Sequence, residues 1–472
     1  MKQQPLYLEL YERLKAQIIE GQYQSGDKFP SKRALQQHLS TSNTTIEHAY
    51  QYLLDEGYIY SKPRSGYYVS DIESLPTLNQ STPTQAFRDT SLTNETTEED
   101  EDYRYSFNLS EIDTQYFPLK QFRKYARDVF ETEQSQLLLQ GYPKGENTLR
   151  QQIARYVFNS RGVSCHTSQV IIGSSTKQLI NLLTDLLKHS KFIIEDPSYP
   201  PIKQVLDQKH IPYEQLEVEE DGICTDHLHE THHDVVYVTP SHQFPTGYVM
   251  NLKKRTQLIN WARQSEERYI IEDDYDSEFR YFGKPISALQ SLDQSGKVIY
   301  MSTFSKSLFP SCRVAYMILP ERLLAIYESM QYKEVNTVPV HLQYIIAAFM
   351  KSGGFERHVN KMRKLYRSKL TFILEALKPY ENQLQIDGAL TGMHFTLTVT
   401  NGRSLSECLQ RAEALSLKII PFQSFDTDET ETKFILGFGG IPFSELKTHT
   451  EALIQALVVK RLSSNVEIKY RF

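Results

Sequence analysis

A lysine followed seven residues later by an arginine stands directly after a run of residues typical of a buried strand. Lys306 and Arg313 lie in STFSKSLFPSCRVAY, which continues from the apolar run VIYMS. Open α/β sheets bind ligands at the carboxyl ends of their strands, where both side chains would emerge. The lysine amine can form an imine with an aldehyde, and a planar guanidinium suits a phosphate dianion. Thr303 and Ser305 add hydroxyl groups to the same turn.

Two other strand-like runs are followed by polar groups that would complete such a site. Asp273 and Tyr275 end the run YIIEDDYDSEF and offer a carboxylate and a phenol. Ser175 and Thr176, in IIGSSTKQL, open a predicted helix, and a helix N-terminus is a ready anion site. Tyr199, in EDPSYPP, is interpreted as an aromatic ring that stacks on a ligand, with a core tyrosine as the alternative.

Together these groups have the composition of a pyridoxal phosphate site. Such a site needs a lysine for the imine, an acid for the pyridine nitrogen, a donor for the ring oxygen and a phosphate cradle. Each signal is weak alone, because a single lysine after a strand is usually a solvated surface charge. Their joint order along the chain favours pyridoxal phosphate as the cofactor.

The acidic pair Asp273–Asp274 has two other interpretations, a solvated pair and a metal site. A metal would require a second acidic or histidine cluster at suitable spacing. The run HHD at 232–234 stands at the entry to a strand, where a surface turn is the better interpretation. The four cysteines are far apart and lack metal-ligand spacing, which suits a reducing compartment. No metal site is therefore predicted.

The elements that must position these groups predict an α/β fold. Apolar runs alternate with helix-length segments, as in a mainly parallel sheet with crossover helices. These runs are Phe192–Ile194, Val235–Val238, Tyr269–Ile271 and Val298–Met301. A mixed α+β subdomain is expected near 365–472. With 472 residues, the chain is long enough for at least two domains.

A break in composition at residues 76–104 divides the chain. This stretch has seven threonines, seven acidic residues and two basic ones, so it is predicted to be a flexible linker between domains at 1–75 and 105–472. No apolar run approaches the roughly 20 residues of a membrane span, and the start has no signal-peptide core. A cytoplasmic protein with no membrane partner is expected.

Residues 1–75 carry the pattern of three helices and a hairpin. Apolar residues at every fourth position from Leu6 to Ile18 predict a first helix, Ser31 a cap for the second, and residues 42–56 a third. Tyr58–Ser61 and Tyr67–Ser70 are predicted strands around KPRSG, which suits a wing lying against DNA phosphates. The alternative is a small protein-interaction module.

Charge within residues 1–75 is informative only locally. The region has eight Lys and Arg residues against nine Asp and Glu. Its cations gather at the start of the second helix, at Lys28, Lys32 and Arg33, and in the hairpin, at Lys62 and Arg64. These are the places where a winged helix meets the DNA backbone.

The stretch FPSKRALQQHLSTSNTTIEHAYQYLLDEGYIYSKPRSGYYV resembles the winged helix of the GntR family of regulators. Its P-S-x-R, T-T, L-x-x-E-G and x-G-Y-x-V positions occur in order. The resemblance implies a double-stranded DNA operator as partner. With the local cations, it predicts DNA contacts at Ser31, Lys32, Arg33, Asn43, Thr44, Thr45, Lys62, Arg64 and Gly66. Asn43 and Glu47 stand where several relatives carry arginine, so a different operator is expected.

Residues 105–472 resemble fold-type I aminotransferases, and specifically the aminotransferase-like domain of MocR-type regulators, a branch of the GntR family. GYPKGENTLRQQIARY, IIEDDYDSEFRYFG and TFSKSLFPSCRVAY match that branch in order. The resemblance implies that Lys306 carries the internal aldimine, Asp273 meets the pyridine nitrogen and Tyr275 the ring oxygen. It assigns the phosphate to Ser175, Thr176, Thr303 and Arg313. It also implies a domain-swapped, head-to-tail homodimer in which each winged helix packs on the partner's large domain.

Three positions depart from the pattern of amino-acid-binding relatives. By the resemblance, Pro201 and Gly440 replace arginines that grip the ligand's carboxylate, with Arg403 as an alternative for the second. The loss of such a charge-assisted pair costs about 1.5–3 kcal/mol of binding. Phe244, in QFPTG, replaces the asparagine that binds the ring oxygen in catalytic aminotransferases.

The sequence therefore predicts a DNA-binding regulator without efficient transaminase activity. Pyridoxal phosphate itself is the favoured effector, as in MocR-type regulators of the genes for pyridoxal phosphate (vitamin B6) synthesis. Three alternatives stay open. They are a regulator that senses an amino acid through an external aldimine, an active aminotransferase with an accessory winged helix, and a cofactor-free scaffold that uses the fold for dimerisation.

Overall fold

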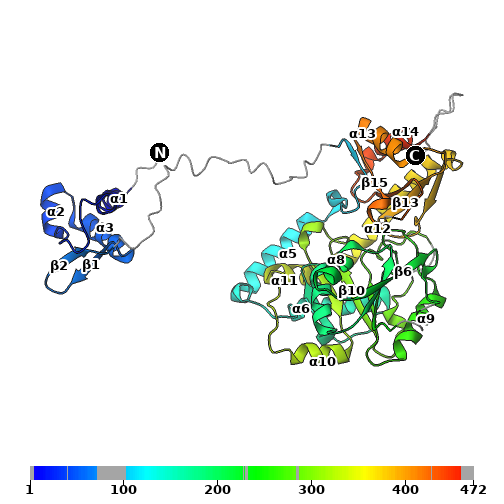
Figure 1. The fold of residues 1–472 in the computed structure, drawn as a ribbon, viewed down its shortest axis with the longest axis horizontal. Coiled ribbons are helices and arrows are strands. Elements are labelled where there is room, and N and C mark those ends of the chain that lie inside the picture. Colours follow the sequence, from blue (N-terminus) through cyan, green and yellow to red (C-terminus); the bar gives the residue numbers. More distant parts are fainter. Residues whose placement is uncertain are drawn as a thin grey trace. The chain divides into compact units, whose positions relative to one another are not determined.

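The computed structural model describes residues 5–39, 41–71, 103–226, 228, 232–282, 286–426 and 428–458. The chain divides into two compact units, one within residues 1–99 and one within 100–472, and each is described by itself (Figure 1). The predicted linker at 76–104 falls almost wholly outside the described residues, so its character stays a prediction. None of the described helices is long and apolar enough to cross a membrane.

The first unit consists of three helices and a hairpin, as predicted. The elements are α1 (Leu6–Ile19), α2 (Lys32–Leu39), α3 (Asn43–Asp55), β1 (Ile59–Lys62) and β2 (Gly66–Val69). Its core includes Leu10 and Leu14 of α1 and Ile46 and Leu53 of α3. Leu6, the first member of the predicted apolar stripe, is 64% exposed, so the buried stripe of α1 begins only at Leu10.

Both hairpin strands lie one residue nearer the turn than predicted. Lys62 pairs with Gly66, which leaves only residues 63–65 to connect the strands. Arg64 and Gly66 make this short turn possible by adopting positive φ angles of 61° and 109°. The left-handed turn thus extends the pairing up to Lys62, beyond the predicted end at Ser61.

The second unit is built on an eight-stranded sheet in the order β4-β11-β10-β9-β8-β5-β6-β7. Its strands are β4 (Val170–Gly173), β5 (Phe192–Asp196), β6 (Tyr213–Glu219), β7 (Gly222–Ile223), β8 (Val235–Val238), β9 (Tyr269–Asp273), β10 (Val298–Thr303) and β11 (Ala315–Ile318). All four predicted strand runs are confirmed. The pairs from β10 to β6 are parallel, whereas β11 and β7 run antiparallel to their neighbours. The predicted α/β class is therefore correct.

Helices cover both faces of this sheet (Figure 1). They are α5 (Leu119–Thr132), α6 (Asn147–Arg161), α7 (Thr176–Leu186), α8 (Pro200–Gln208), α9 (Leu252–Arg263), α10 (Glu321–Ser329) and α11 (Val340–Lys351). Helices α7, α8 and α10 share one apolar core with the sheet. Helices α6 and α11 bury residues such as Tyr300 of β10 from the other side, and α9 packs in a third cluster. Strands covered on both faces explain the continuous apolar runs in the sequence.

The predicted C-terminal α+β subdomain is also present. It comprises α12 (Gly354–Leu377), β12 (Leu384–Asp387), β13 (His394–Val399), α13 (Leu405–Ala414), β14 (Leu417–Lys418), β15 (Ile420–Pro421), β16 (Lys433–Gly437) and α14 (Leu446–Leu457). An antiparallel sheet runs β12-β13-β16-β15, and β14 pairs with β3 (Tyr105–Ser106) from the start of the unit. Phe395 and Leu436 face the apolar core of this sheet, which leaves the alternate residues His394 and Ile435 on the opposite face.

A buried ion pair ties the start of the second unit to this subdomain. Lys369 of α12 lies 2.8 Å from Asp113, and both side chains are almost fully enclosed. Lys369 also donates to the carbonyl of Gly439 at 3.0 Å. Breaking a buried pair is costly because one charge stays behind without its partner.

Replacing Lys369 by methionine is expected to lower the free energy of unfolding by about 3–5 kcal/mol, because the Asp113 carboxylate loses its cation. Urea unfolding of the full chain measures this, followed by the fluorescence of Trp261, the one tryptophan in the sequence. The double variant Asp113→Asn/Lys369→Met is the control and should recover most of the loss. A single variant as stable as the wild type would contradict the assignment.

Candidate cofactor site and DNA-binding surface

The predicted cofactor residues come together at one edge of the eight-stranded sheet. β10, β9, β8 and β5 are parallel, and β4 points the same way because β11 is antiparallel to both β4 and β10. Their carboxyl ends therefore meet at one edge, and each candidate stands there. Ser175 and Thr176 follow β4, Tyr199 follows β5, Asp273 and Tyr275 close β9, Thr303, Ser305 and Lys306 close β10, and Arg313 precedes β11.

Asp273 is the most informative of these residues. Its side chain is buried, and its Oδ2 accepts a hydrogen bond from the Tyr237 hydroxyl at 2.6 Å, whereas its Oδ1 is buried without a partner. Burial raises the pKa of Asp273 to about 7, against the opposing effect of the Tyr237 hydrogen bond. A buried oxygen without a partner is costly unless a ligand uses it, and a protonated pyridine nitrogen is a matching donor.

Lys306 lies in the turn after β10 with its amine enclosed. Burial lowers the pKa of Lys306, while the charge of the nearby Asp276 opposes that shift. Its Nζ donates to the carbonyl of Leu109, in the segment that leads into the second unit. A lowered pKa increases the fraction of neutral amine, which is the form that attacks an aldehyde.

Two tyrosines lie close to Asp273 at the same edge of the sheet. Burial raises the pKa of Tyr199 to about 12, with Asp273 adding to the shift and Arg313 opposing it, so the phenol is within electrostatic reach of both charges. Its ring meets Phe244 edge-on at a centroid distance of 5.6 Å. Burial also raises the pKa of Tyr275, and Asp273 and Tyr199 contribute to that shift. The two aromatic residues and Asp273 thus belong to one site.

The described hydrogen bonds connect only some of the candidate phosphate ligands to one another. The Thr303 hydroxyl accepts from the backbone N–H of Ser305 at 3.2 Å. Arg313 is exposed and has a left-handed backbone with φ 47°, a conformation that costs a non-glycine residue about 1–3 kcal/mol and is typical of functional sites. Ser175 caps α7 by accepting from Gln178 N–H at 3.2 Å, and Thr176 is the first residue of that helix. The described hydrogen bonds join Thr303 to Ser305 but do not join either to Ser175.

The structure shows the surroundings of Pro201, Gly440 and Arg403, the residues that the resemblance relates to carboxylate binding. Pro201 lies in the first turn of α8. A Cβ atom at Gly440 would lie 2.4 Å from the Cβ of Glu111, so a long side chain there requires a rearrangement. Arg403 donates to the carbonyl of Ala456 at 3.0 Å, within the helical layer of the subdomain. This hydrogen bond commits Arg403 to the subdomain and does not support it as the alternative ligand clamp.

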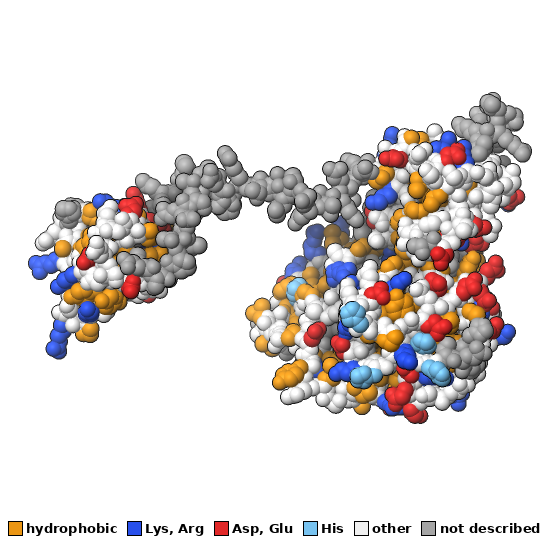
Figure 2. Space-filling model, in the orientation of Figure 1, with side chains coloured by type: hydrophobic (Ala, Val, Ile, Leu, Met, Phe, Trp, Pro, Cys, Tyr) orange, Lys and Arg blue, Asp and Glu red, His pale blue; other side chains and the backbone are white. Residues whose placement is uncertain are grey.

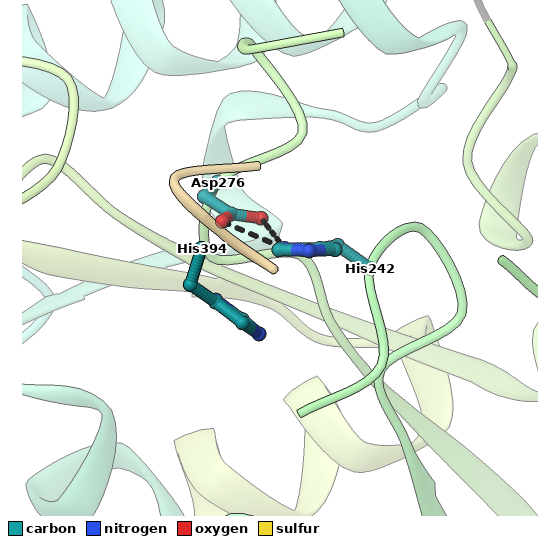
Figure 3. Close-up of side chains that lie close together, drawn as sticks. All are labelled: His242, Asp276 and His394. Atoms are coloured by element: carbon teal, nitrogen blue, oxygen red, sulfur yellow. Dashed lines mark hydrogen bonds and ion pairs between the residues drawn. The ribbon is translucent and has the colours of Figure 1, made fainter. Parts of the chain in front are cut away.

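His242, Asp276 and His394 form a buried group beside Tyr275 and Lys306 that the sequence analysis did not find (Figure 3). The His242 Nδ1 lies 2.9 Å and 3.1 Å from the two Asp276 oxygens. The two imidazole rings are 4.3 Å apart, and the Nε2 of each is buried without a partner. Burial lowers the pKa of His394 well below its ordinary value, and Lys306 contributes to that shift.

The three side chains could also hold a metal ion. Each offers one possible ligand atom, and these atoms lie within 4.8 Å of one another. The residues come from three separate segments, so no local spacing could indicate them. The sequence gives one indication of them. His242 and Asp276 follow strands β8 and β9, just as the predicted cofactor residues follow the ends of their own strands.

The predicted DNA contacts lie on α2, on the start of α3 and on the hairpin. Ser31, Arg33, Asn43, Thr44, Lys62, Arg64 and Gly66 are exposed, and Lys32 and Thr45 are half-buried. Figure 2 shows Lys and Arg side chains at the edge of the first unit that carries these elements. Ser42 caps α3 by accepting from Thr45 N–H at 3.2 Å, so Thr45 also serves to start the helix. Lys32 lies 3.7 Å from Glu47, which offsets part of its charge.

Comparison with known families assigns the two units separately. The profile of aminotransferase class I and II matches residues 106–415, and that of bacterial regulatory proteins of the gntR family matches residues 6–69. An uncharacterised HTH-type transcriptional regulator of Bacillus subtilis, YdeL, is 38% identical, over 94% of this chain and 95% of its own length. The pyridoxine biosynthesis transcriptional regulator PdxR of Corynebacterium glutamicum is 25% identical over 91% of each chain.

Solved structures support the fold of the second unit. The kynurenine aminotransferase of Pyrococcus horikoshii superposes with a TM-score of 0.67 and 24% identity, over 75% of this chain and 90% of that one. At this identity the likeness establishes the fold-type I aminotransferase architecture alone.

The Asp273→Asn variant is expected to have a flatter dependence of stability on pH. In the cofactor-free protein, the folded state keeps the Asp273 proton up to about pH 7, whereas an ordinary aspartate loses its proton near pH 4. This carboxyl therefore contributes stability that is lost as pH rises between these values, and an amide does not titrate. Urea unfolding at several pH values between 4.5 and 7.5 measures the slope.

Part of the slope should survive in that variant, because burial raises the pKa values of Glu195 and Glu278 to about 7 as well. Wild type and variant with identical slopes would show that Asp273 is ionised in the folded protein throughout this range.

Proposed function

Because the chain belongs to the MocR-type branch of the GntR family, DNA-binding regulators with an aminotransferase-like effector domain, we propose that pyridoxal phosphate is its effector. The regulated genes would be those of vitamin B6 synthesis. The observation that carries the proposal is the unpartnered Oδ1 of Asp273, at the edge of the sheet that also carries the buried amine of Lys306.

Each part of the cofactor has a candidate partner in the chain. Asp273 would hold the proton of the pyridine nitrogen, and Tyr199 would stack on the ring. Tyr275 would bind the ring oxygen, and Lys306 would bind the aldehyde carbon. Thr303, Ser305, Ser175, Thr176 and Arg313 would hold the phosphate. The cofactor supplies an aldehyde that bonds reversibly to the lysine and an electron-withdrawing ring.

A regulator of this kind needs cofactor binding but no substrate turnover. The two positions at which relatives bind a carboxylate are Pro201 and Gly440, neither of which carries a charge, and Arg403 is engaged elsewhere. Phe244 offers no donor to the ring. These features support a protein that keeps the cofactor contacts and lacks the contacts to an amino acid. The likeness to PdxR, a regulator of pyridoxine biosynthesis, points the same way.

We also propose that the chain binds its operator as a homodimer. The winged helix would bind an operator through the contacts on α2, α3 and the hairpin, in the cytoplasm, where the chromosome lies. A homodimer with exchanged, head-to-tail winged helices would present two of these units. The second unit exposes large apolar side chains, including Leu138 at 86% and Tyr332 at 82%, which a partner subunit could cover.

Titrating the cofactor-free protein with pyridoxal phosphate is expected to give a visible absorbance band in the wild type and not in Lys306→Ala. Affinity for the DNA upstream of its own gene should change over the same range of cofactor concentration. Lys364→Ala, which removes an exposed lysine of α12, is the matched control. If absorbance develops but DNA binding changes only when an amino acid is added, pyridoxal phosphate is not the effector.

Purified protein loaded with pyridoxal phosphate is expected to give no sustained production of ketoacid from common amino acids with a ketoacid acceptor. The physical reason is the lack of a guanidinium to orient the substrate's carboxylate. Product is followed by chromatography over many equivalents of protein, with the Lys306→Ala variant as the blank. Continued turnover above that blank would make the chain an aminotransferase.

A further inference from the structure

Three side chains at the ends of β8 and β9 form a chain of short polar contacts. The Asp276 carboxylate lies 2.9 Å from the Nδ1 of His242, and the Tyr275 hydroxyl lies 3.1 Å from the same nitrogen. Asp276 also accepts from the backbone N–H of Met393 at 3.2 Å. Figure 3 shows Asp276 directed at the edge of the His242 ring, with His394 beside them.

Hydrogen-bonding chemistry determines which atom carries the proton in the contact between His242 and Asp276. A carboxylate oxygen only accepts hydrogen bonds, so a hydrogen bond to Asp276 requires that His242 Nδ1 carries the proton. A protonated Nδ1 has no lone pair for the Tyr275 hydroxyl to donate to. The hydroxyl oxygen can then accept a share of the same N–H, and its own hydrogen is left for another acceptor.

The surroundings are shaped to keep His242 and Asp276 in this position. Gly392 has φ 74°, and a Cβ atom there would lie 1.9 Å from His242 Nδ1 and 2.6 Å from an Asp276 oxygen. The His394 ring packs on His242 at 4.3 Å. The pair is therefore enclosed by a turn that only glycine permits, and Lys306 is near enough for Asp276 to influence its pKa.

We propose that His242, oriented by Asp276, is a positioning residue that fixes the Tyr275 hydroxyl as a hydrogen-bond donor to the ring oxygen of pyridoxal phosphate. This contact takes over from the amide that catalytic aminotransferases have at the position of Phe244. The inference rests on the proposed cofactor binding and does not depend on the response of DNA binding.

The Asp276→Asn substitution tests this because it removes the charge that holds the proton on His242 Nδ1. The Met393 N–H keeps the amide oxygen in the place of Oδ2, so the amide NH₂ takes the place of Oδ1, 3.1 Å from Nδ1 in the wild type. A donor at that position favours the tautomer that has a lone pair on Nδ1. The Tyr275 hydroxyl then donates to His242 and turns away from the cofactor. The affinity for pyridoxal phosphate is expected to fall about tenfold, the size of one lost hydrogen bond. Absorbance at fixed pH should shift from the visible to the near-ultraviolet band.

A double-mutant cycle with Tyr275→Phe separates this role from a direct one. Asp276 also acts on Lys306 by its charge, and that effect would persist without the phenol. The proposal requires that Asp276→Asn has a much smaller effect on affinity and spectrum once Tyr275 is phenylalanine, since only the direct effect on Lys306 is then left. Additive effects would overturn it, as would an unchanged spectrum in Asp276→Asn alone.

Two further variants test whether the change in the spectrum is specific to the His242–Asp276 pair. Asp207→Asn removes an exposed carboxylate of α8 and should leave the spectrum unchanged, whereas Gly392→Ala, which displaces the pair, should reproduce Asp276→Asn. A divalent ion that co-purifies with the wild type and not with Asp276→Asn would overturn the proposal in favour of a metal site. If the wild type itself gives no visible band, the proposed function fails, and the inference with it.

Discussion

The parallel alignment of β10, β9, β8 and β5 is the constraint on which the second unit depends. Parallel strands must return through crossover helices, so every strand of this set ends at the same edge. The loops at that edge are free to carry chemistry because the helices and the sheet supply the core. Residues as distant in sequence as Ser175 and Arg313 therefore stand at one edge, where the pairing of β4 with β11 brings Gly173 opposite Ala315.

Burying carboxyl groups at this edge of the sheet costs free energy unless each oxygen has a partner. The buried carboxyl groups differ in how many of their oxygens have one. Glu195 is satisfied by Thr239 and Gln243, and Asp274 is paired with Arg161 at 2.8 Å, which lowers its pKa despite burial. Asp273 has one oxygen satisfied and one left open. A ligand with a hydrogen-bond donor would remove this deficit, which is why the open oxygen supports the proposed cofactor site.

The site has the groups that the proposed cofactor requires. Asp273, Tyr275 and Lys306 lie at the carboxyl ends of β9 and β10, and the positions that the resemblance relates to carboxylate binding carry the uncharged Pro201 and Gly440. On β16 and β13, Ile435 and His394 share the face opposite the apolar core. Burial holds the pKa of His394 well below its ordinary value, so its ring is neutral near pH 7.

The sequence by itself determined the fold class and the predicted strands, and it placed the candidate cofactor residues at strand ends, because apolar runs and the polar groups that follow them are local patterns. It also identified the winged helix through the capping serine and the cations of one short stretch. Only the tertiary structure decided that Leu6 is exposed, that Arg403 serves the subdomain, and that His242, Asp276 and His394 form one group. These are properties of segments that meet through space, and no spacing within a single segment encodes which side chain is left without a partner.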